Sequence, residues 1–74
     1  MKEIIPGITI DPKVRFGKPV IKNTRVPVDL IVGKIAGGMT TEEITREYKL
    51  KRTDVLAALR YAAQTVREES LLYV

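Results

Sequence analysis

Two prolines, Pro19 and Pro27, constrain the fold of this chain more than any other residues. Proline has no amide hydrogen, so it cannot donate a hydrogen bond inside a β-sheet, although it suits the start of a helix. The run GKPVIKNTRVPV (17–28) therefore predicts a strand at a sheet edge, followed by a helix that begins at Pro27. Because an unpaired edge invites a second chain, we expect this run to contact another molecule, most simply a second copy.

Alternating apolar side chains predict further short strands in the first third of the chain. Ile8–Ile10 alternates before the turn signal Asp11-Pro12, and Lys13–Phe16 alternates before Gly17. Val20–Lys22 is the candidate edge strand. Asn23 then marks a bend, because asparagine tolerates the left-handed backbone conformation.

Helix signals fill the rest of the sequence. The first helix is expected to run from Pro27 to Gly37-Gly38, and Gly33 inside it predicts close packing against a neighbour. The clearest signal is the capping box Thr40 to Glu43, which predicts a second helix from Thr41 to about Tyr48.

A third helix is predicted with Thr53 as its cap, Asp54 in its first turn and its end near Glu69. Its apolar positions form a stripe: Val55, Leu56, Leu59, Ala62, Ala63 and Val66. A short turn between two helices is typical of a helix-turn-helix. The side chains expected to face inward are Ile44, Tyr48, Leu50, Val55 and Leu59.

These elements predict one α+β domain that is mostly α-helical: a β arm over 1–27, a three-helix unit over 28–69 and an apolar tail over 70–74. A chain of 74 residues buries only about 60% of its unfolded surface, so its stability is expected to be marginal. Dimerisation would supply further burial. The expected homodimer interface contains Ile8, Ile10, Leu71 and Leu72.

The composition argues against an enzyme. The chain has no cysteine and no histidine, so it lacks a disulfide framework, a zinc site of the usual ligands and an imidazole base. Its single serine, Ser70, has no base to activate it. We expect no catalysis, no metal and no cofactor. Without a signal peptide or a run of roughly 20 apolar residues, the expected location is cytoplasmic, with no membrane contact.

The net charge of +4 lies entirely in the first 27 residues, which carry six basic and two acidic side chains. The remaining residues carry seven of each sign. Two interpretations are open. The basic side chains protect exposed strand edges from aggregation, or they form an arm that binds an acidic partner.

A helix-turn-helix offers the start of its second helix to the major groove of DNA. The candidate DNA-binding residues are Lys49, Lys51, Arg52, Thr53 and Tyr61. Acidic residues and two small alanines oppose this interpretation: Glu42, Glu43, Glu47, Asp54, Ala57 and Ala58. The alternative is a purely structural three-helix core.

Several motifs occur in a familiar order: Ile10-Asp11-Pro12, Gly17–Ile21, Thr24–Val28, Gly38–Thr40 with Glu42–Ile44, and Asp54–Leu59 with Tyr61-Ala62. Together they resemble the bacterial and archaeal family called domain of unknown function 433, over about residues 8–63. The GKPVI and TRVPV runs are the most specific part of this resemblance. Asn23 stands where the family usually has glycine, and it can adopt the same positive φ.

The resemblance implies a homeodomain-like helical unit preceded by a small β element. It also implies a VapB-type antitoxin that binds a PIN-like ribonuclease toxin and, in some members, operator DNA. Arginine pairs with carboxylates in bidentate fashion, so the expected toxin-binding residues are Arg15, Lys18, Lys22 and Arg25. VapB-like antitoxins typically wrap their toxin with a long C-terminal extension. Here only residues 70–74 follow the last helix, so the contact is expected through the domain itself or this apolar tail.

Two other functions stay open at this point. One is an autonomous helix-turn-helix repressor whose DNA binding falls steeply with salt. The other is a dimeric scaffold that binds no DNA.

Overall fold

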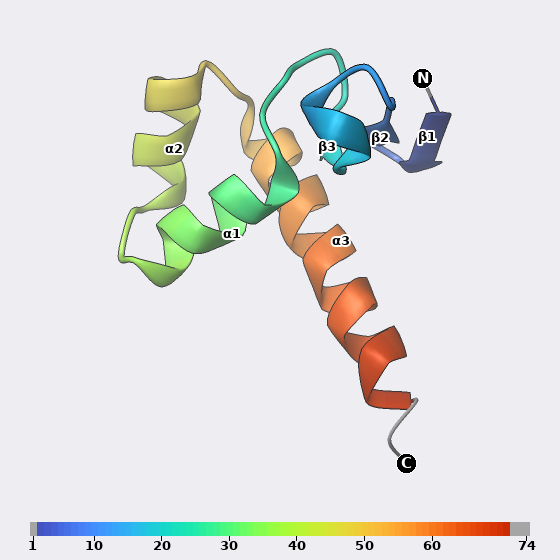
Figure 1. Cartoon of the computed structure of the whole chain (residues 1–74). Coiled ribbons are helices and arrows are strands. Elements are labelled where there is room, and N and C mark those ends of the chain that lie inside the picture. Colours follow the sequence, from blue (N-terminus) through green and yellow to red (C-terminus); the bar gives the residue numbers. More distant parts are fainter. Residues whose placement is uncertain (1, 72–74) are drawn as a thin grey trace.

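The computed structural model describes residues 2–71 and contains a small sheet followed by three helices (Figure 1). The strands are β1 (Lys2–Ile5), β2 (Ile8–Ile10) and β3 (Val20–Ile21), with a 3-10 turn, η1 (Arg15–Gly17), between the last two. The helices are α1 (Val28–Ala36), α2 (Thr41–Tyr48) and α3 (Arg52–Leu71). This arrangement confirms the predicted, mostly helical α+β class.

The sheet is antiparallel, with the order β1-β2-β3. Strand β1 had not been predicted; it pairs with β2 across a tight turn at Gly7, whose φ is +88°. The strand expected over Lys13–Phe16 is wrong. An Asp11 carboxylate oxygen accepts the Lys13 amide at 2.9 Å and closes a turn instead, and Phe16 is completely exposed.

The proline-flanked run lies at a sheet edge as predicted, because β3 is an outer strand. Its contacts, however, are made with its own chain. The Ile21 amide donates to the Val26 carbonyl at 2.9 Å, and the Val28 amide donates to the Pro19 carbonyl at 3.0 Å. Val20 and Ile21 are buried. Local backbone bonds therefore fold this run onto its own chain, and its contact with another molecule stays a prediction.

The starts of α1 and α2 follow the predicted signals. Pro27 was expected at the first helical position of α1 but occupies the N-cap, the residue before it. The helix ends before Gly37-Gly38, as predicted. In α2 the Glu43 amide donates to the Thr40 hydroxyl at 3.1 Å, and the Glu43 carboxylate accepts from the Thr40 amide at 2.9 Å. The capping box therefore forms in full.

Helix α3 begins one residue before the predicted cap. A carboxylate oxygen of Asp54 accepts the Lys51 amide at 2.9 Å, so Asp54 satisfies the helix start from within the first turn. Thr53 lies in the helix and is exposed, and the cap assigned to it is wrong. The helix also continues past Glu69 to Leu71, so the first residues of the predicted tail are helical.

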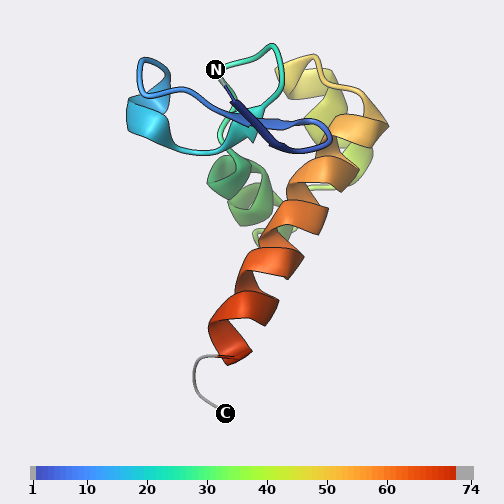
Figure 2. The same ribbon diagram turned by 90° about the vertical axis from the view of Figure 1, so that its right-hand side faces the viewer.

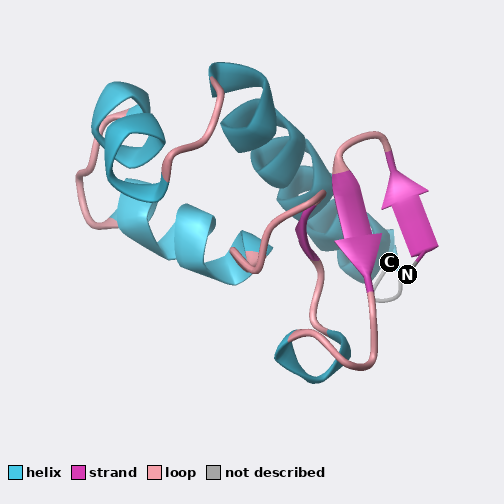
Figure 3. Ribbon diagram, turned by 90° about the horizontal axis from the view of Figure 1, so that it is seen from above, coloured by secondary structure: helices cyan, strands magenta, loops and turns pink. Residues whose placement is uncertain are grey.

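The core is built on the first half of α3, which contacts both other helices and the sheet. Figure 3 shows the sheet on one side of the molecule and α2 on the other. The buried apolar residues are Ile8, Ile21, Val28, Ile31, Ile44, Leu50, Val55, Ala57 and Ala58. Tyr48 and Leu59 pack against them, so the five side chains predicted to face inward all contribute.

The second half of α3 extends beyond the rest of the protein (Figures 1 and 2). The apolar stripe predicted along this helix is consequently buried only at its start. Val55 is fully buried, whereas Val66 is 61% exposed. The 3.6-residue period correctly predicts one helical face, but the structure provides a neighbour for only part of it.

Two exposed carboxylates make the stability of the fold depend on pH. The Gly7 amide and the Lys22 ammonium hold the pKa of Glu3 below its ordinary value of 4.5, and the Thr40 amide and hydroxyl do the same for the pKa of Glu43. A carboxylate whose pKa is lowered by folding stabilises the folded state, and its contribution is complete above pH 4.5. This contribution is lost as the pH falls through the lowered pKa of the folded state.

We therefore expect the double variant Glu3→Gln/Glu43→Gln to be less stable than the wild type at neutral pH, with the difference shrinking in acid. Glutamine still accepts the amide hydrogen bonds but carries no charge, so the comparison isolates the charge. Thermal unfolding between neutral and strongly acidic pH measures it, with Glu47→Gln in the exposed part of α2 as the control. A difference that stays constant across this range would contradict the assignment.

Candidate functional site

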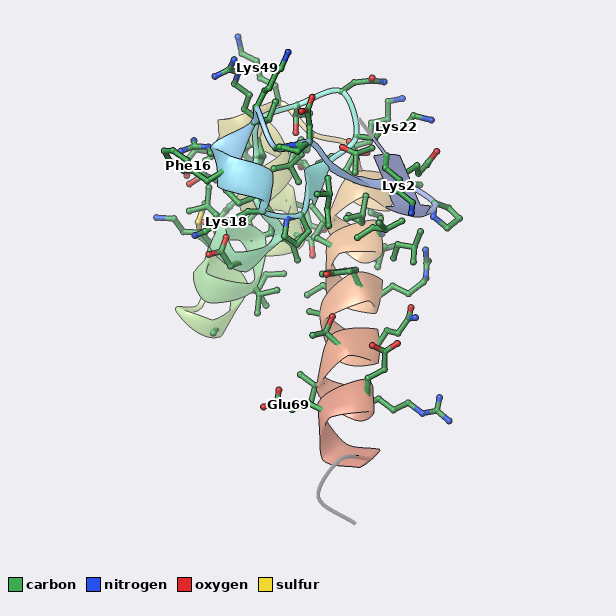
Figure 4. All side chains as sticks on the ribbon, turned by 45° about the vertical axis from the view of Figure 1, so that its right-hand side comes forward. Lys2, Phe16, Lys18, Lys22, Lys49 and Glu69 are labelled. Carbon is green, nitrogen blue, oxygen red and sulfur yellow. The ribbon has the colours of Figure 1, made fainter. Side chains whose placement is uncertain are left out.

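The four basic residues predicted to bind a toxin do not form one cluster. Lys18 pairs with Asp29 at 3.3 Å, and Lys22 pairs with Glu3 at 3.2 Å. Figure 4 shows Lys18 beside Phe16 on one side of the molecule and Lys22 on the other. Lys22 is therefore separated from the rest.

Arg15 and Arg25 lie together on neighbouring loops. The Nε atom of Arg15 donates to the backbone carbonyl of Arg25 at 3.1 Å, which ties η1 to the segment that follows β3. Within residues 2–71, neither arginine takes part in an ion pair. Both guanidinium groups therefore remain available to carboxylates of another molecule.

Phe16 is the residue that sequence reasoning missed. Its side chain is 100% exposed, and its backbone is left-handed, as are those of its neighbours: φ is 52° at Arg15, 56° at Phe16 and 81° at Gly17. A left-handed backbone costs a non-glycine residue roughly 1–2 kcal/mol. The turn signals on both sides, Asp11-Pro12 and Gly17, were evidence that Phe16 belongs to a loop.

We call the surface formed by Arg15, Phe16, Lys18 and Arg25 the basic loop face. All four residues are exposed. The surface combines an aromatic ring with three cations, only one of which has an ion-pair partner among the described side chains. Such a surface is suited to a partner that offers carboxylates around an apolar depression.

The DNA-binding candidates are divided by the structure. Lys49, Lys51, Arg52 and Thr53 are exposed around the turn between α2 and α3. Arg52 is paired with Glu42 of α2 at 3.6 Å. Tyr61 is half-buried and lies on the side of α3 that faces α1. It follows Arg52 by nine residues, about two and a half helical turns, and is therefore on the opposite face of α3.

The β1-β2 turn lies against the start of α3. A Cβ atom on Gly7 would stand 3.1 Å from the Cβ of Ala57, and Ala57 is buried. Ala58 is fully buried in the core. The two alanines that opposed base reading are thus packing residues, and this part of the α3 surface is covered by the sheet.

An open apolar groove of about 550 Å³ separates α1 from the second half of α3. Its lining includes the Lys18–Asp29 pair at one rim and otherwise consists of Pro19, Val28, Val32, Gly33, Tyr61, Ala62, Thr65 and Val66. Gly33, predicted to pack closely against a neighbour, has no atom from beyond its own helical turn within 4 Å of the position of a Cβ, among the described residues. That expectation is corrected.

Gly33→Ala is consequently expected to stabilise the protein by about 0.5–1 kcal/mol. Alanine favours the helix over glycine and finds open space here. Gly38→Ala is the control of opposite sign, because Gly38 has φ of +103° and any Cβ there is strained. Chemical denaturation of both variants tests the pair of predictions, and a destabilised Gly33→Ala protein would contradict the first.

The predicted dimer residues fall in different places. Ile8 is 0% exposed within its own chain, so its assignment to an interface is wrong: it belongs to the core. Ile10 is half-buried. Leu71 is the last described residue of α3, although its side chain is not described, and Leu72 lies outside the described residues.

Within residues 2–71, no helix is long and apolar enough to cross a membrane. No group of three or more histidine, cysteine, aspartate or glutamate side chains stands where it could hold a metal ion in the same range.

Comparison with known proteins identifies the family. The family described as "Protein of unknown function (DUF433)" matches residues 8–62. The crystal structure of a DUF433 member protein from Anabaena variabilis ATCC 29413 is similar to this structure, with a TM-score of 0.77 and 33% sequence identity. The similarity covers 84% of this chain and 62% of that chain, so this chain spans less than two thirds of its relative. No curated protein matches. The chain belongs to the DUF433 family.

Proposed function

We propose that this chain is the antitoxin-like half of a toxin–antitoxin pair and that it binds a PIN-like ribonuclease through the basic loop face. One observation carries the proposal: Arg15 and Arg25 are tied together beside a fully exposed Phe16, and no described carboxylate forms an ion pair with either arginine. Nucleases of this type hold metal ions with clustered carboxylates. Two arginine forks are well matched to such a cluster.

The electrostatics favour the arginines over the lysines as contacts. Lys18 and Lys22 must lose a carboxylate partner of their own before either pairs fully with another molecule. Arg15 and Arg25 lose no such partner. Their planar guanidinium groups also lose less conformational freedom for each hydrogen bond that they form.

Co-expression with the product of the adjacent open reading frame tests the proposal. Arg15→Ala/Arg25→Ala is expected to weaken the complex by at least about tenfold, because truncating a desolvated charged contact typically costs more than 1.4 kcal/mol. Lys2→Ala/Lys22→Ala removes the same total charge from exposed residues outside the basic loop face (Figure 4) and is the matched control, with an expected change below about threefold. Isothermal titration calorimetry measures both.

Three outcomes would contradict the proposal. The adjacent reading frame does not encode a nuclease-like protein, the wild-type chain does not co-purify with that protein, or the two double variants bind equally well. Equal binding would mean that general positive charge, rather than the arginine pair, attracts the partner.

Reading of operator DNA is the second candidate, favoured by the exposed cations Lys49 and Lys51 at the turn before α3. Gel-shift titrations of wild type and Lys51→Ala/Arg52→Ala test it. Binding that falls steeply with salt and weakens in the variant would support an autonomous repressor. A protein that retards no DNA at low salt, and that binds no nuclease, would instead be a scaffold.

A further inference from the structure

We infer that Phe16 is the anchor of the protein interface: its ring enters an apolar pocket on an acidic partner, and the flanking arginines pair with carboxylates at the rim of that pocket. The inference rests on the proposed function, since it names the residue of the basic loop face that contributes most to binding. It adds a specific geometry, a ring inserted at the centre of a charged contact.

The exposure of Phe16 contributes nothing to the packing of residues 2–71. It is the most exposed of the large apolar side chains in the described part of the chain, at 100%, compared with 61% for Val66 and 43% for Leu56. An aromatic ring in water gives the folded protein no burial energy. No side chain of residues 2–71 covers the single phenylalanine of the chain, so its ring is open to another molecule.

The backbone that carries the Phe16 ring is in an unfavourable conformation. Arg15 and Phe16 are consecutive residues in the left-handed backbone conformation. Residues other than glycine, asparagine and aspartate rarely adopt this conformation. Strain of this kind persists where the surrounding structure imposes it, and it is concentrated at functional sites. Here the strained residue is also the exposed aromatic one.

Hydrogen bonds hold the turn in place. The Gly17 amide donates to the Val14 carbonyl at 3.1 Å, and the Lys18 amide donates to the Arg15 carbonyl at 3.1 Å. The bond from Arg15 to the Arg25 carbonyl ties the turn to the opposite loop. The ring is therefore presented on a preorganised turn, which lowers the entropy lost on binding.

The surroundings of the ring favour an acidic protein over a nucleic acid. Single-stranded nucleic acids bind where several aromatic rings stack successive bases. Tyr48 and Tyr61 are half-buried, so within residues 2–71 Phe16 is the one fully exposed ring. A lone apolar ring among cations is instead suited to a pocket lined by apolar atoms and rimmed by carboxylates.

The experiment uses the full chain and, as probe, a catalytically inactive form of the protein encoded by the adjacent reading frame. Phe16→Asn removes the ring, and asparagine tolerates the left-handed backbone conformation of this turn. Phe16→Tyr keeps the ring. Val66→Gln removes an exposed apolar side chain from α3 and is the matched control.

We expect Phe16→Asn to weaken the complex by about thirtyfold or more, as truncation of an anchor residue does. Its thermal midpoint should be equal to or above that of the wild type, because the turn is relieved of strain. Phe16→Tyr and Val66→Gln should each bind within about threefold of the wild type. Calorimetry measures the affinities, and circular dichroism the midpoints.

Wild-type binding combined with undiminished binding by Phe16→Asn would overturn the anchor and leave the proposed function standing. Failure of the wild-type chain to bind the nuclease would overturn both. Retardation of a single-stranded oligoribonucleotide by the wild type, lost in Phe16→Asn, would also overturn the inference and assign the ring to base stacking.

Discussion

Ile8→Ala is expected to lower the free energy of unfolding by about 2–5 kcal/mol. Ile8 is fully buried at the centre of the sheet, where it pairs with Ile21 of β3. Truncation removes apolar contact area and leaves a cavity between the sheet and α3. Because small domains have total stabilities of only about 5–15 kcal/mol, the variant should be largely unfolded under mild conditions.

Urea unfolding followed by circular dichroism measures this loss, and Ile10→Ala is the matched control. Ile10 belongs to the same strand but is only half-buried, so its truncation should cost clearly less. An interface between copies would behave differently: its loss would make the unfolding midpoint depend on protein concentration. Equal losses in the two variants, or such a dependence, would contradict the assignment of Ile8 to the core of a single chain.

Gly7→Ala is expected to destabilise the protein by about 2–4 kcal/mol, from two causes. The φ of +88° at Gly7 strains any residue with a Cβ atom, and that Cβ would stand 3.1 Å from the Cβ of Ala57. The backbone cannot easily move away. The Gly7 amide donates to the Glu3 carboxylate at 2.8 Å, and its carbonyl accepts the Lys22 amide at 2.9 Å.

Gly38→Ala separates the two causes, since Gly38 has positive φ but open space around it. It should show the backbone cost alone, about 1 kcal/mol. Combining Gly7→Ala with Ala57→Gly relieves the contact, so the double variant should be more stable than the sum of the single losses implies. Strict additivity would show that the Gly7–Ala57 approach contributes nothing.

Local signals predicted the helices well because their causes are local. Thr40 and Glu43 satisfy each other within one turn, so the start of α2 follows from four consecutive residues. Asn23 adopts φ of 63° as its residue type predicts. Family membership also followed from short motifs, and the match over residues 8–62 lies within the region predicted to resemble the family.

Except for the cap assigned to Thr53, the errors arose where burial, rather than local preference, decided the outcome. Lys13–Phe16 has the alternation of a strand, but no neighbouring strand or core surface pairs with it, so it forms a turn. The candidate site was predicted only in part for the same reason. Charge counting identified Arg15 and Arg25, whereas the exposure of Phe16 and the pairing of Lys18 and Lys22 depend on residues distant in sequence.

The sequence by itself determined the presence of three helices, the start of α2 and the excess of positive charge in the first third, because caps, turns and periodicity act within a few residues. The tertiary structure alone decided that residues 17–28 fold onto their own chain, that half of α3 extends past the core, and that Phe16 faces water. These outcomes depend on which surfaces meet in three dimensions, and that is set by packing between residues far apart in the chain.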